Sequence, residues 1–181
     1  MHRYGQARET EFGEKPIVVA RFSPDGSRFA VGTWGWRVAV WSRDTLGTPA
    51  EFNFDDVVSY SAIDDIAFSP DGKKIAAATK NGTPRVWDLA SGSLVFELKK
   101  HTQPVHAITF SSDGTQIATG GTDGMIMVWD SFTGRFQAKL HGHAAQVNAL
   151  STPARGFTLV SISSDRSIRS WDLSGTKVFS D

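Results

Sequence analysis

Ile117-Ala118-Thr119-Gly120-Gly121-Thr122-Asp123-Gly124-Met125-Ile126-Met127-Val128-Trp129-Asp130 has the pattern of two short apolar strands joined by a Gly/Asp turn. The same register recurs three more times, ending at Trp41-Ser42, Trp87-Asp88 and Trp171-Asp172. Consecutive copies are about 40–45 residues apart, a period typical of repeat architectures. This repeat decides the fold.

Each copy contains four predicted strands separated by turn signals. In the third copy the strands are predicted at Val105–Phe110, Gln116–Gly120, Met125–Trp129 and Arg135–Leu140. The first three copies share a Ser-x-Asp-Gly turn whose glycine accepts a positive φ, and the fourth keeps only that glycine, Gly156. Because the strands are short and regularly spaced and no helical period is present, we predict an all-β fold.

Composition excludes several classes of function. The 181 residues include 19 basic and 19 acidic side chains, so the chain lacks the net positive charge that favours nucleic-acid binding. Cysteine is absent, no apolar run has the ~18 residues of a membrane span, and residues 1–16 are polar. We therefore expect a cytoplasmic protein that binds neither nucleic acid nor membrane. Asn81-Gly82-Thr83 matches a glycosylation sequon but is better interpreted as a hairpin turn.

The repeats resemble those of WD-repeat β-propeller proteins. The resemblance is carried by the Trp-Asp endings, by Gly142-His143 and by the weaker Lys100-His101, and it covers residues 17–181. It implies a β-propeller of four WD-type four-stranded blades, at about residues 17–58, 59–100, 101–142 and 143–181. Residues 1–16 would precede them as an N-terminal strand or latch segment.

The family pattern also implies a buried hydrogen-bond network of His, Ser/Thr, Asp and Trp in each repeat. The third copy supplies His101, Thr119, Asp123 and Trp129, and the fourth supplies His143, Ser161, Asp165 and Trp171. The second copy has Ser59, Ala77, Asn81 and Trp87, and the first has Gly13, Val31, Gly35 and Trp41. We expect the networks of the first two copies to be broken. Ser, His and Asp also form catalytic triads, but their recurrence at the repeat spacing favours a structural role.

No catalytic, cofactor or metal site is predicted. His141 and His143 share a strand face but lack a third ligand nearby, and Gly120–Gly124 lacks the Lys-Ser/Thr of a phosphate loop. The acid pairs Asp55-Asp56 and Asp64-Asp65 are interpreted as solvated loop residues, with no reason for raised pKa values.

The resemblance implies that partners bind the face carrying the turns between the second and third strands of each repeat. The candidate binding face consists of Trp34, Trp36, Asp64, Lys80, His106, Thr122, Gln146, Asn148 and Ser164. Exposed tryptophans favour protein interfaces. Alternatively, a ring of Trp34 or Trp36 fills the gap left by the missing network of the first repeat.

We expect a non-catalytic interaction scaffold for a protein or peptide. Two alternatives stay open: an architectural half-propeller or a truncated or designed fragment without a ligand, and an accessory module of an enzyme. Four blades leave two apolar faces without neighbours, so we also predict a homodimer that closes an eight-bladed ring. In that ring Gly5–Phe12 would pair beside Thr176–Phe179 of the other copy.

Overall fold

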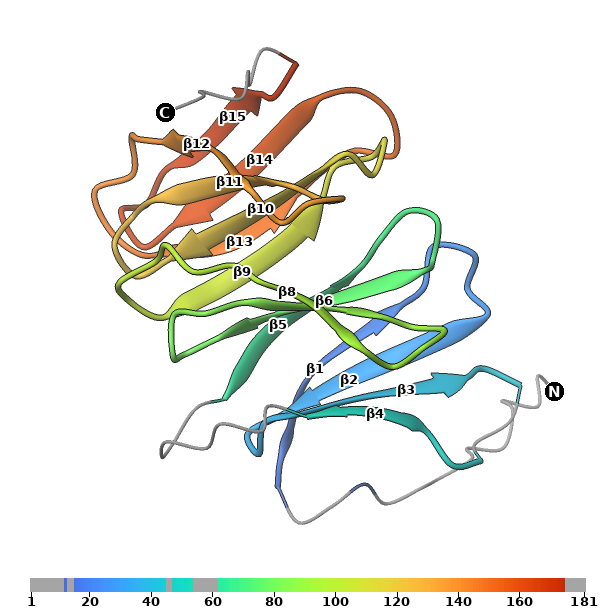
Figure 1. Ribbon diagram of the computed structural model, residues 1–181. Coiled ribbons are helices and arrows are strands. Elements are labelled where there is room, and N and C mark those ends of the chain that lie inside the picture. Colours follow the sequence, from blue (N-terminus) through green and yellow to red (C-terminus); the bar gives the residue numbers. More distant parts are fainter. Residues whose placement is uncertain (1–11, 13–14, 45–46, 54–61, 175–181) are drawn as a thin grey trace, which may run out of the picture.

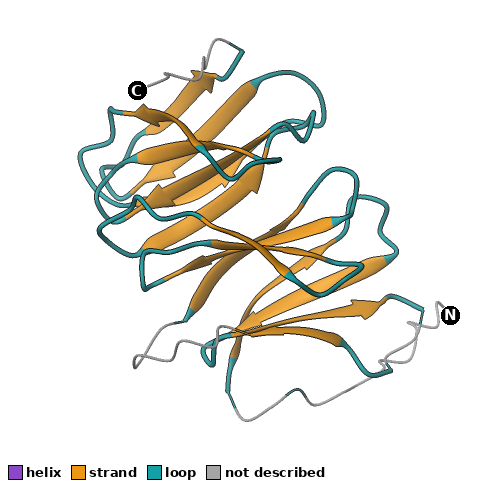
Figure 2. Ribbon diagram, in the orientation of Figure 1, coloured by secondary structure: helices purple, strands orange, loops and turns teal. Residues whose placement is uncertain are grey.

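The fold is all-β, which confirms the predicted class. A computed structural model describes residues 12, 15–44, 47–53 and 62–174, and this part of the chain forms four antiparallel sheets without a helix (Figure 1, Figure 2). No described segment is a helix capable of crossing a lipid bilayer.

Each sheet is a meander in which neighbouring strands follow one another in sequence. The first contains β1 (Ile17–Phe22), β2 (Arg28–Thr33), β3 (Arg37–Ser42) and β4 (Ala50–Asn53). The second contains β5 (Ile63–Phe68), β6 (Lys74–Thr79), β7 (Arg85–Asp88) and β8 (Leu94–Glu97). The third contains β9 (Val105–Phe110), β10 (Gln116–Gly121), β11 (Ile126–Asp130) and β12 (Phe136–Leu140). The fourth contains β13 (Val147–Ser151), β14 (Thr158–Ser163) and β15 (Ile168–Asp172).

The predicted strands of the third repeat agree with β9 to β12 to within one residue at each end. A fourth strand of the last sheet was expected at Thr176–Phe179, which lies outside the described residues, as do residues 5–11 of the expected latch. Phe12 is described, and its ring meets the Trp41 ring edge-on with centroids 5.0 Å apart.

The Ser-x-Asp-Gly turns hold the first two strands of a sheet in register. In the first sheet the Ser23 hydroxyl donates to the Asp25 carboxylate at 2.6 Å, and Gly26 has the predicted positive φ of 67°. Hydrogen bonds from Ser23 and Ser27 hold the pKa of Asp25 well below its usual range. The same geometry recurs at Ser69–Gly72 and Ser111–Gly114.

The sheets stack face to face in chain order, and the core lies in three layers between them (Figure 1). Each layer joins small and β-branched residues of one sheet to the repeat tryptophan and its neighbours on the next. Between the first two sheets, Ala30, Val38 and Val40 pack with Ile75, Ala77 and Trp87. Because each sheet buries one face against each neighbour, the stack needs no helix to cover it.

Small residues on β2 and β10 allow the next sheet to approach closely. A Cβ on Gly32 would come within 2.6 Å of Ile63 Cγ2, and one on Gly120 within 2.6 Å of Val147 Cγ1. Ala78, fully buried beside Val105, occupies the equivalent position in the second sheet. Ile63 and Val147, the first residues of β5 and β13, therefore pack against the backbone of the preceding sheet.

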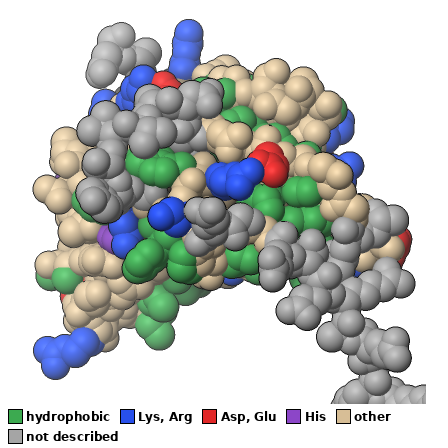
Figure 3. Space-filling model, turned by 90° about the horizontal axis from the view of Figure 1, so that it is seen from below, with side chains coloured by type: hydrophobic (Ala, Val, Ile, Leu, Met, Phe, Trp, Pro, Cys, Tyr) green, Lys and Arg blue, Asp and Glu red, His purple; other side chains and the backbone are tan. Residues whose placement is uncertain are grey.

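The two outward faces of the stack are apolar. On the fourth sheet Ile162 is 43% exposed and Ile168 is 75% exposed. On the first sheet the Phe29 and Trp41 rings are stacked 5.4 Å apart, and Phe22 is exposed beside them. Figure 3, viewed from the first-sheet end of the molecule, shows hydrophobic side chains among Lys and Arg side chains.

Candidate functional site

One repeated backbone contact gathers the candidate binding face at one end of the inner strands. The residue after the second strand of each sheet donates its N–H to the carbonyl of the residue preceding the first strand. The four pairs are Trp34 to Pro16, Lys80 to Ala62, Thr122 to Pro104 and Ser164 to Gln146. The turn residues therefore lie beside the starts of β1, β5, β9 and β13, where Asp64, His106 and Asn148 project.

A continuous line of side chains crosses the first three sheets on this face. Lys80 Nζ lies 5.7 Å from the centroid of the Trp34 ring and 3.9 Å from Asp64 Oδ1. Asp64 Oδ2 is 2.6 Å from His106 Nδ1, and His106 Nε2 is 2.7 Å from Thr122 Oγ1. We call the set Trp34, Lys80, Asp64, His106 and Thr122 the polar relay. Its members come from three different sheets.

The fourth sheet contributes a separate polar group. Gln146 Nε2 donates to Asn148 Oδ1 at 3.0 Å, and Asn148 Nδ2 donates to Ser164 Oγ at 3.0 Å. All three residues are partly or fully exposed, so they present amide and hydroxyl groups to solvent.

The two tryptophans of the first sheet have different surroundings. Trp34 is 58% exposed, whereas Trp36 is half-buried and packs against the core between the first two sheets. Trp36 also has a φ of 64°, at a turn position where the second and third sheets have Gly82 and Gly124. We therefore keep Trp34 in the candidate binding face and assign Trp36 to the core.

Below this face, the fourth sheet contains a closed buried network. His143 Nδ1 lies 2.9 Å from Asp165 Oδ2, and His143 Nε2 lies 2.7 Å from Ser161 Oγ. The indole N–H of Trp171 donates to the same hydroxyl at 2.8 Å. A hydrogen bond from the Ser167 hydroxyl is the main reason that the pKa of Asp165 lies well below its usual range.

The third sheet has the same residue types in a looser arrangement. Thr119 Oγ1 is 2.8 Å from His101 Nε2 and accepts the Trp129 indole N–H at 2.9 Å. However, His101 Nδ1 is 3.6 Å from Asp123 Oδ2, which is too long for a hydrogen bond, and this buried nitrogen has no hydrogen-bond partner among the residues that the structure describes. Burial lowers the pKa of His101, and the Asp123 carboxylate only partly opposes the shift.

The first two sheets lack the hydroxyl that accepts from tryptophan. Val31 and Ala77 occupy the position of Thr119, and within the described part of the chain the buried indole nitrogen of Trp41 has no hydrogen-bond partner. Asn81 instead accepts from the Thr79 hydroxyl at 2.7 Å and from the Thr83 N–H at 2.9 Å. Gly13 and Ser59, the other predicted members, lie outside the described residues.

Comparison with known proteins gives this arrangement a family. The family model described as WD domain, G-beta repeat matches residues 57–88, 92–130 and 134–172, which is more than half of the chain. The chain belongs to the WD-repeat family. The matched segments cover the second, third and fourth sheets, which are blades of a β-propeller-type fold.

Several curated WD-repeat relatives match over short segments. Periodic tryptophan protein 2 of Arabidopsis thaliana is 31% identical over 98 residues, or 52% of this chain and 10% of the relative. Its homolog in Schizosaccharomyces pombe is 36% identical over 92 residues, or 49% of this chain and 10% of the relative. An uncharacterized WD repeat-containing protein of the same yeast is 53% identical over 34 residues, or 19% of this chain and 7% of the relative. The aligned WD repeats thus span a tenth or less of the length of these relatives.

Asp65 is a residue whose environment differs from the prediction. Asp64 and Asp65 lie on the inner strand β5 of the second WD blade, not in a solvated loop, and burial raises the pKa of Asp65. Its carboxylate binds Arg21 of the first blade at 2.8 Å and accepts the Ile108 N–H of the third blade at 3.2 Å. Asp65 therefore links three blades. The sequence did contain a signal for this role. Asp65 is an acid at an inner-strand position where the other repeats have Val19, Ala107 and Ala149. Asp55 and Asp56 lie outside the described residues.

The WD networks do not form an accessible catalytic site. The His101 and His143 side chains are fully buried, and the hydroxyl beside each accepts a tryptophan N–H. Within the described ranges, no group of three or more His, Cys, Asp or Glu side chains is placed to hold a metal ion. The WD-repeat family is also generally non-catalytic.

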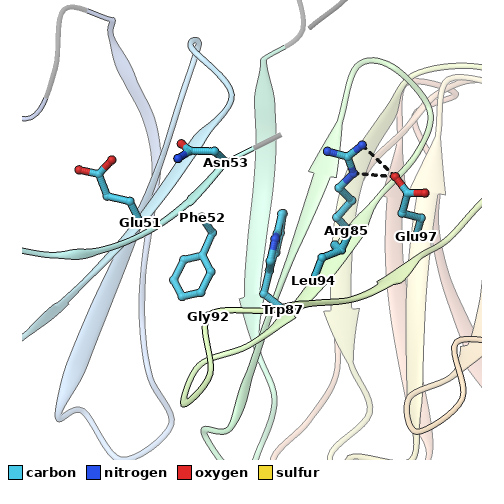
Figure 4. A pocket seen from close by; sticks show the side chains of 8 residues that line it. All are labelled: Glu51, Phe52, Asn53, Arg85, Trp87, Gly92, Leu94 and Glu97. Atoms are coloured by element: carbon cyan, nitrogen blue, oxygen red, sulfur yellow. Dashed lines mark hydrogen bonds and ion pairs between the residues drawn. The ribbon is translucent and has the colours of Figure 1, made fainter. Parts of the chain in front are cut away.

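A cavity of about 500 Å³ lies between the outer strands of the first two blades (Figure 4). Glu51, Phe52 and Asn53 line it from β4, and Arg85, Trp87, Leu94 and Glu97 line it from the second blade. The buried Arg85 guanidinium binds Glu97 Oε1 through Nε at 3.0 Å and a terminal nitrogen at 2.8 Å. Because Arg85 and Glu97 already neutralise each other, we interpret the ion pair as a contact that holds β7 and β8 together.

Proposed function

We propose that the chain is a non-catalytic scaffold that binds a protein or peptide through the candidate binding face. The observation that carries this proposal is Trp34, 58% exposed at one end of a polar relay that crosses three blades. A large, rigid aromatic ring surrounded by oriented polar groups is typical of an interface hot spot.

The chemistry of the face supports binding rather than catalysis. Asp64 binds His106, His106 also contacts the Thr122 hydroxyl, and Lys80 lies between an aromatic ring and a carboxylate. The described face has one hydroxyl beside a base, that of Thr122, 2.7 Å from His106 Nε2. We interpret this pair as a binding group because the WD-repeat family is generally non-catalytic. A scaffold of this kind needs no cofactor.

The test replaces Trp34 with alanine. Peptides selected from a random library on the unmodified chain should bind the Trp34→Ala variant at least about tenfold more weakly, since truncating a hot-spot residue costs about 2 kcal/mol or more. The melting temperature should change little, because the ring is exposed. A matched control is Phe132→Ala, which removes an exposed ring that also lies near a lysine, Lys74 Nζ being 5.3 Å from its centroid. Unchanged peptide affinity together with a large loss of stability in Trp34→Ala would contradict the proposal.

We also propose that the chain self-associates through its outward faces into a ring of eight blades. Exposed Ile162 and Ile168 on the fourth blade and Phe22 on the first support this architecture. Contiguous apolar surface of this kind favours association between blades.

A further inference from the structure

The polar relay contains a carboxylate oxygen that no hydrogen bond uses. Asp64 Oδ2 is fixed by His106, whose second ring nitrogen is in turn fixed by Thr122. Among the described residues Asp64 Oδ1 accepts no hydrogen bond, and the Lys80 ammonium, 3.9 Å away, is beyond hydrogen-bond distance. The relay therefore orients a carboxylate toward the surface and leaves one oxygen available.

An aromatic face lies next to this oxygen. The same Lys80 ammonium is 5.7 Å from the centroid of the exposed Trp34 ring, within the range of a cation–π contact. A single cation can therefore contact the Trp34 ring and Asp64 Oδ1 at once. This is the arrangement that recognises a positively charged side chain: a π face on one side and a fixed carboxylate on the other.

The lysine that occupies this position is held weakly. Its side chain is 42% exposed, whereas that of Asp64 is 18% exposed. Exposed ion pairs add little stability because water screens them and long side chains lose entropy. The ammonium of Lys80 can therefore leave the site when a better cation arrives.

A guanidinium fits the two contacts better than an ammonium. Its plane can stack on an indole ring while its N–H groups donate to a carboxylate oxygen. It is also more weakly hydrated than an ammonium, so less water must be removed on binding. Resting on the proposed scaffold function, we propose that the Trp34–Asp64 site binds an arginine side chain of the partner, which displaces Lys80.

The experiment titrates the uniformly ¹⁵N-labelled chain with capped arginine, N-acetyl-arginine N-methylamide, and follows the indole N–H resonance of Trp34, assigned from a Trp34→Phe variant. Capped arginine should shift this resonance, and capped citrulline, which has the same shape without the charge, should not. Asp64→Asn should abolish the shift while its side-chain oxygen still accepts from His106.

The decisive variant is Lys80→Gln. Removing the resident cation should tighten the binding of capped arginine up to about fivefold, the upper range for an exposed ion pair. Lys73→Gln is the matched control, because it removes the same charge from an exposed lysine at the opposite end of β6 and should leave the affinity unchanged. Weaker arginine binding in Lys80→Gln would overturn the inference, since it would make Lys80 itself a ligand for an acidic group.

Failure of this inference differs from failure of the proposed function. If capped arginine leaves Trp34 unaffected while library peptides still bind in a Trp34-dependent manner, the scaffold stands and the arginine site is wrong. If neither probe depends on Trp34, both proposals are wrong.

Discussion

In the third and fourth blades a single hydroxyl accepts the indole N–H of the repeat tryptophan. Thr119 and Ser161 accept the indole N–H of the tryptophan across the strand pair, but with Val31 in that position the buried Trp41 nitrogen has no partner among the described residues. A buried unpaired donor destabilises the folded state by about 1–3 kcal/mol.

Val31→Thr should therefore stabilise the chain. Threonine has nearly the shape of valine, and its hydroxyl would lie where Thr119 accepts from Trp129. We expect a gain of about 0.5–1.5 kcal/mol in the free energy of unfolding, measured by denaturant titration. Thr119→Val is the reverse control and should destabilise the third blade. A loss of stability in Val31→Thr would show that the first blade cannot orient the hydroxyl toward the indole.

His101 should make stability depend on pH. Burial lowers its pKa below the ordinary value of 6.5, so the unfolded chain binds more protons than the folded chain just below that pH. The contribution of His101 is fully present above pH 6.5 and is lost as the pH falls toward the folded-state pKa.

The measurement compares denaturant titrations of the unmodified chain and of His101→Gln on both sides of that pH. As the pH falls below 6.5, the unmodified chain should lose more of its unfolding free energy than His101→Gln does. Asp65 acts in the opposite sense, because its raised pKa favours the protonated folded chain, but it is common to both proteins and cancels. A difference independent of pH would contradict the assignment.

At the scale of elements, the turn between the second and third strands ends in a left-handed residue. The second and third blades have Gly82 and Gly124 there, with φ values of 81° and 73°, whereas the first and fourth have Trp36 and Arg166, with φ values of 64° and 70°. A side chain in this conformation is strained by roughly 1–2 kcal/mol.

Replacing these two residues with glycine should have opposite effects. Arg166 is exposed, so Arg166→Gly should relieve strain and stabilise the chain by about 0.5–1 kcal/mol after the added freedom of the unfolded chain. Trp36→Gly should destabilise it, because the lost ring packs against the core between the first two blades. Thermal melts should show a higher melting temperature for Arg166→Gly and a lower one for Trp36→Gly. A change in the same direction for both variants would contradict this explanation.

The elements were predictable from sequence because their signals are local. Apolar alternation, Ser-x-Asp-Gly turns and Trp-Asp endings set β9 to β12 to within a residue. The relay was not predictable in the same way. His106 and Asp64 come from different repeats, and their 2.6 Å contact depends on how two blades stack. The role of Asp65 was missed for the same reason, since its partners Arg21 and Ile108 belong to the blades on either side.

At the scale of the whole molecule, the proposed ring predicts a dimer in solution. Light scattering at several concentrations should give about twice the mass of one chain. Ile168→Asp should return it to the mass of one chain, because a charge at a 75% exposed position disfavours an apolar contact without disturbing the fold. Leu94→Asp, also at an exposed apolar position but on β8, should leave the mass doubled. A single-chain mass for the unmodified protein would contradict the ring.

Ile162 has a consequence for the rotational symmetry of any propeller that includes this chain. Gly32, Ala78 and Gly120 hold the equivalent place on the other blades and let the next inner strand pack against the backbone, but Ile162 fills that space. Suppose that a neighbouring blade presents a β-branched residue such as Ile17 at this point. Its inner strand must then lie farther from the fourth blade than the other inner strands lie from their neighbours. A ring closed in this way would therefore have an uneven seam at the fourth blade, with weaker packing than the three contacts between the described sheets. Under heat or mechanical load the propeller should open first at this seam.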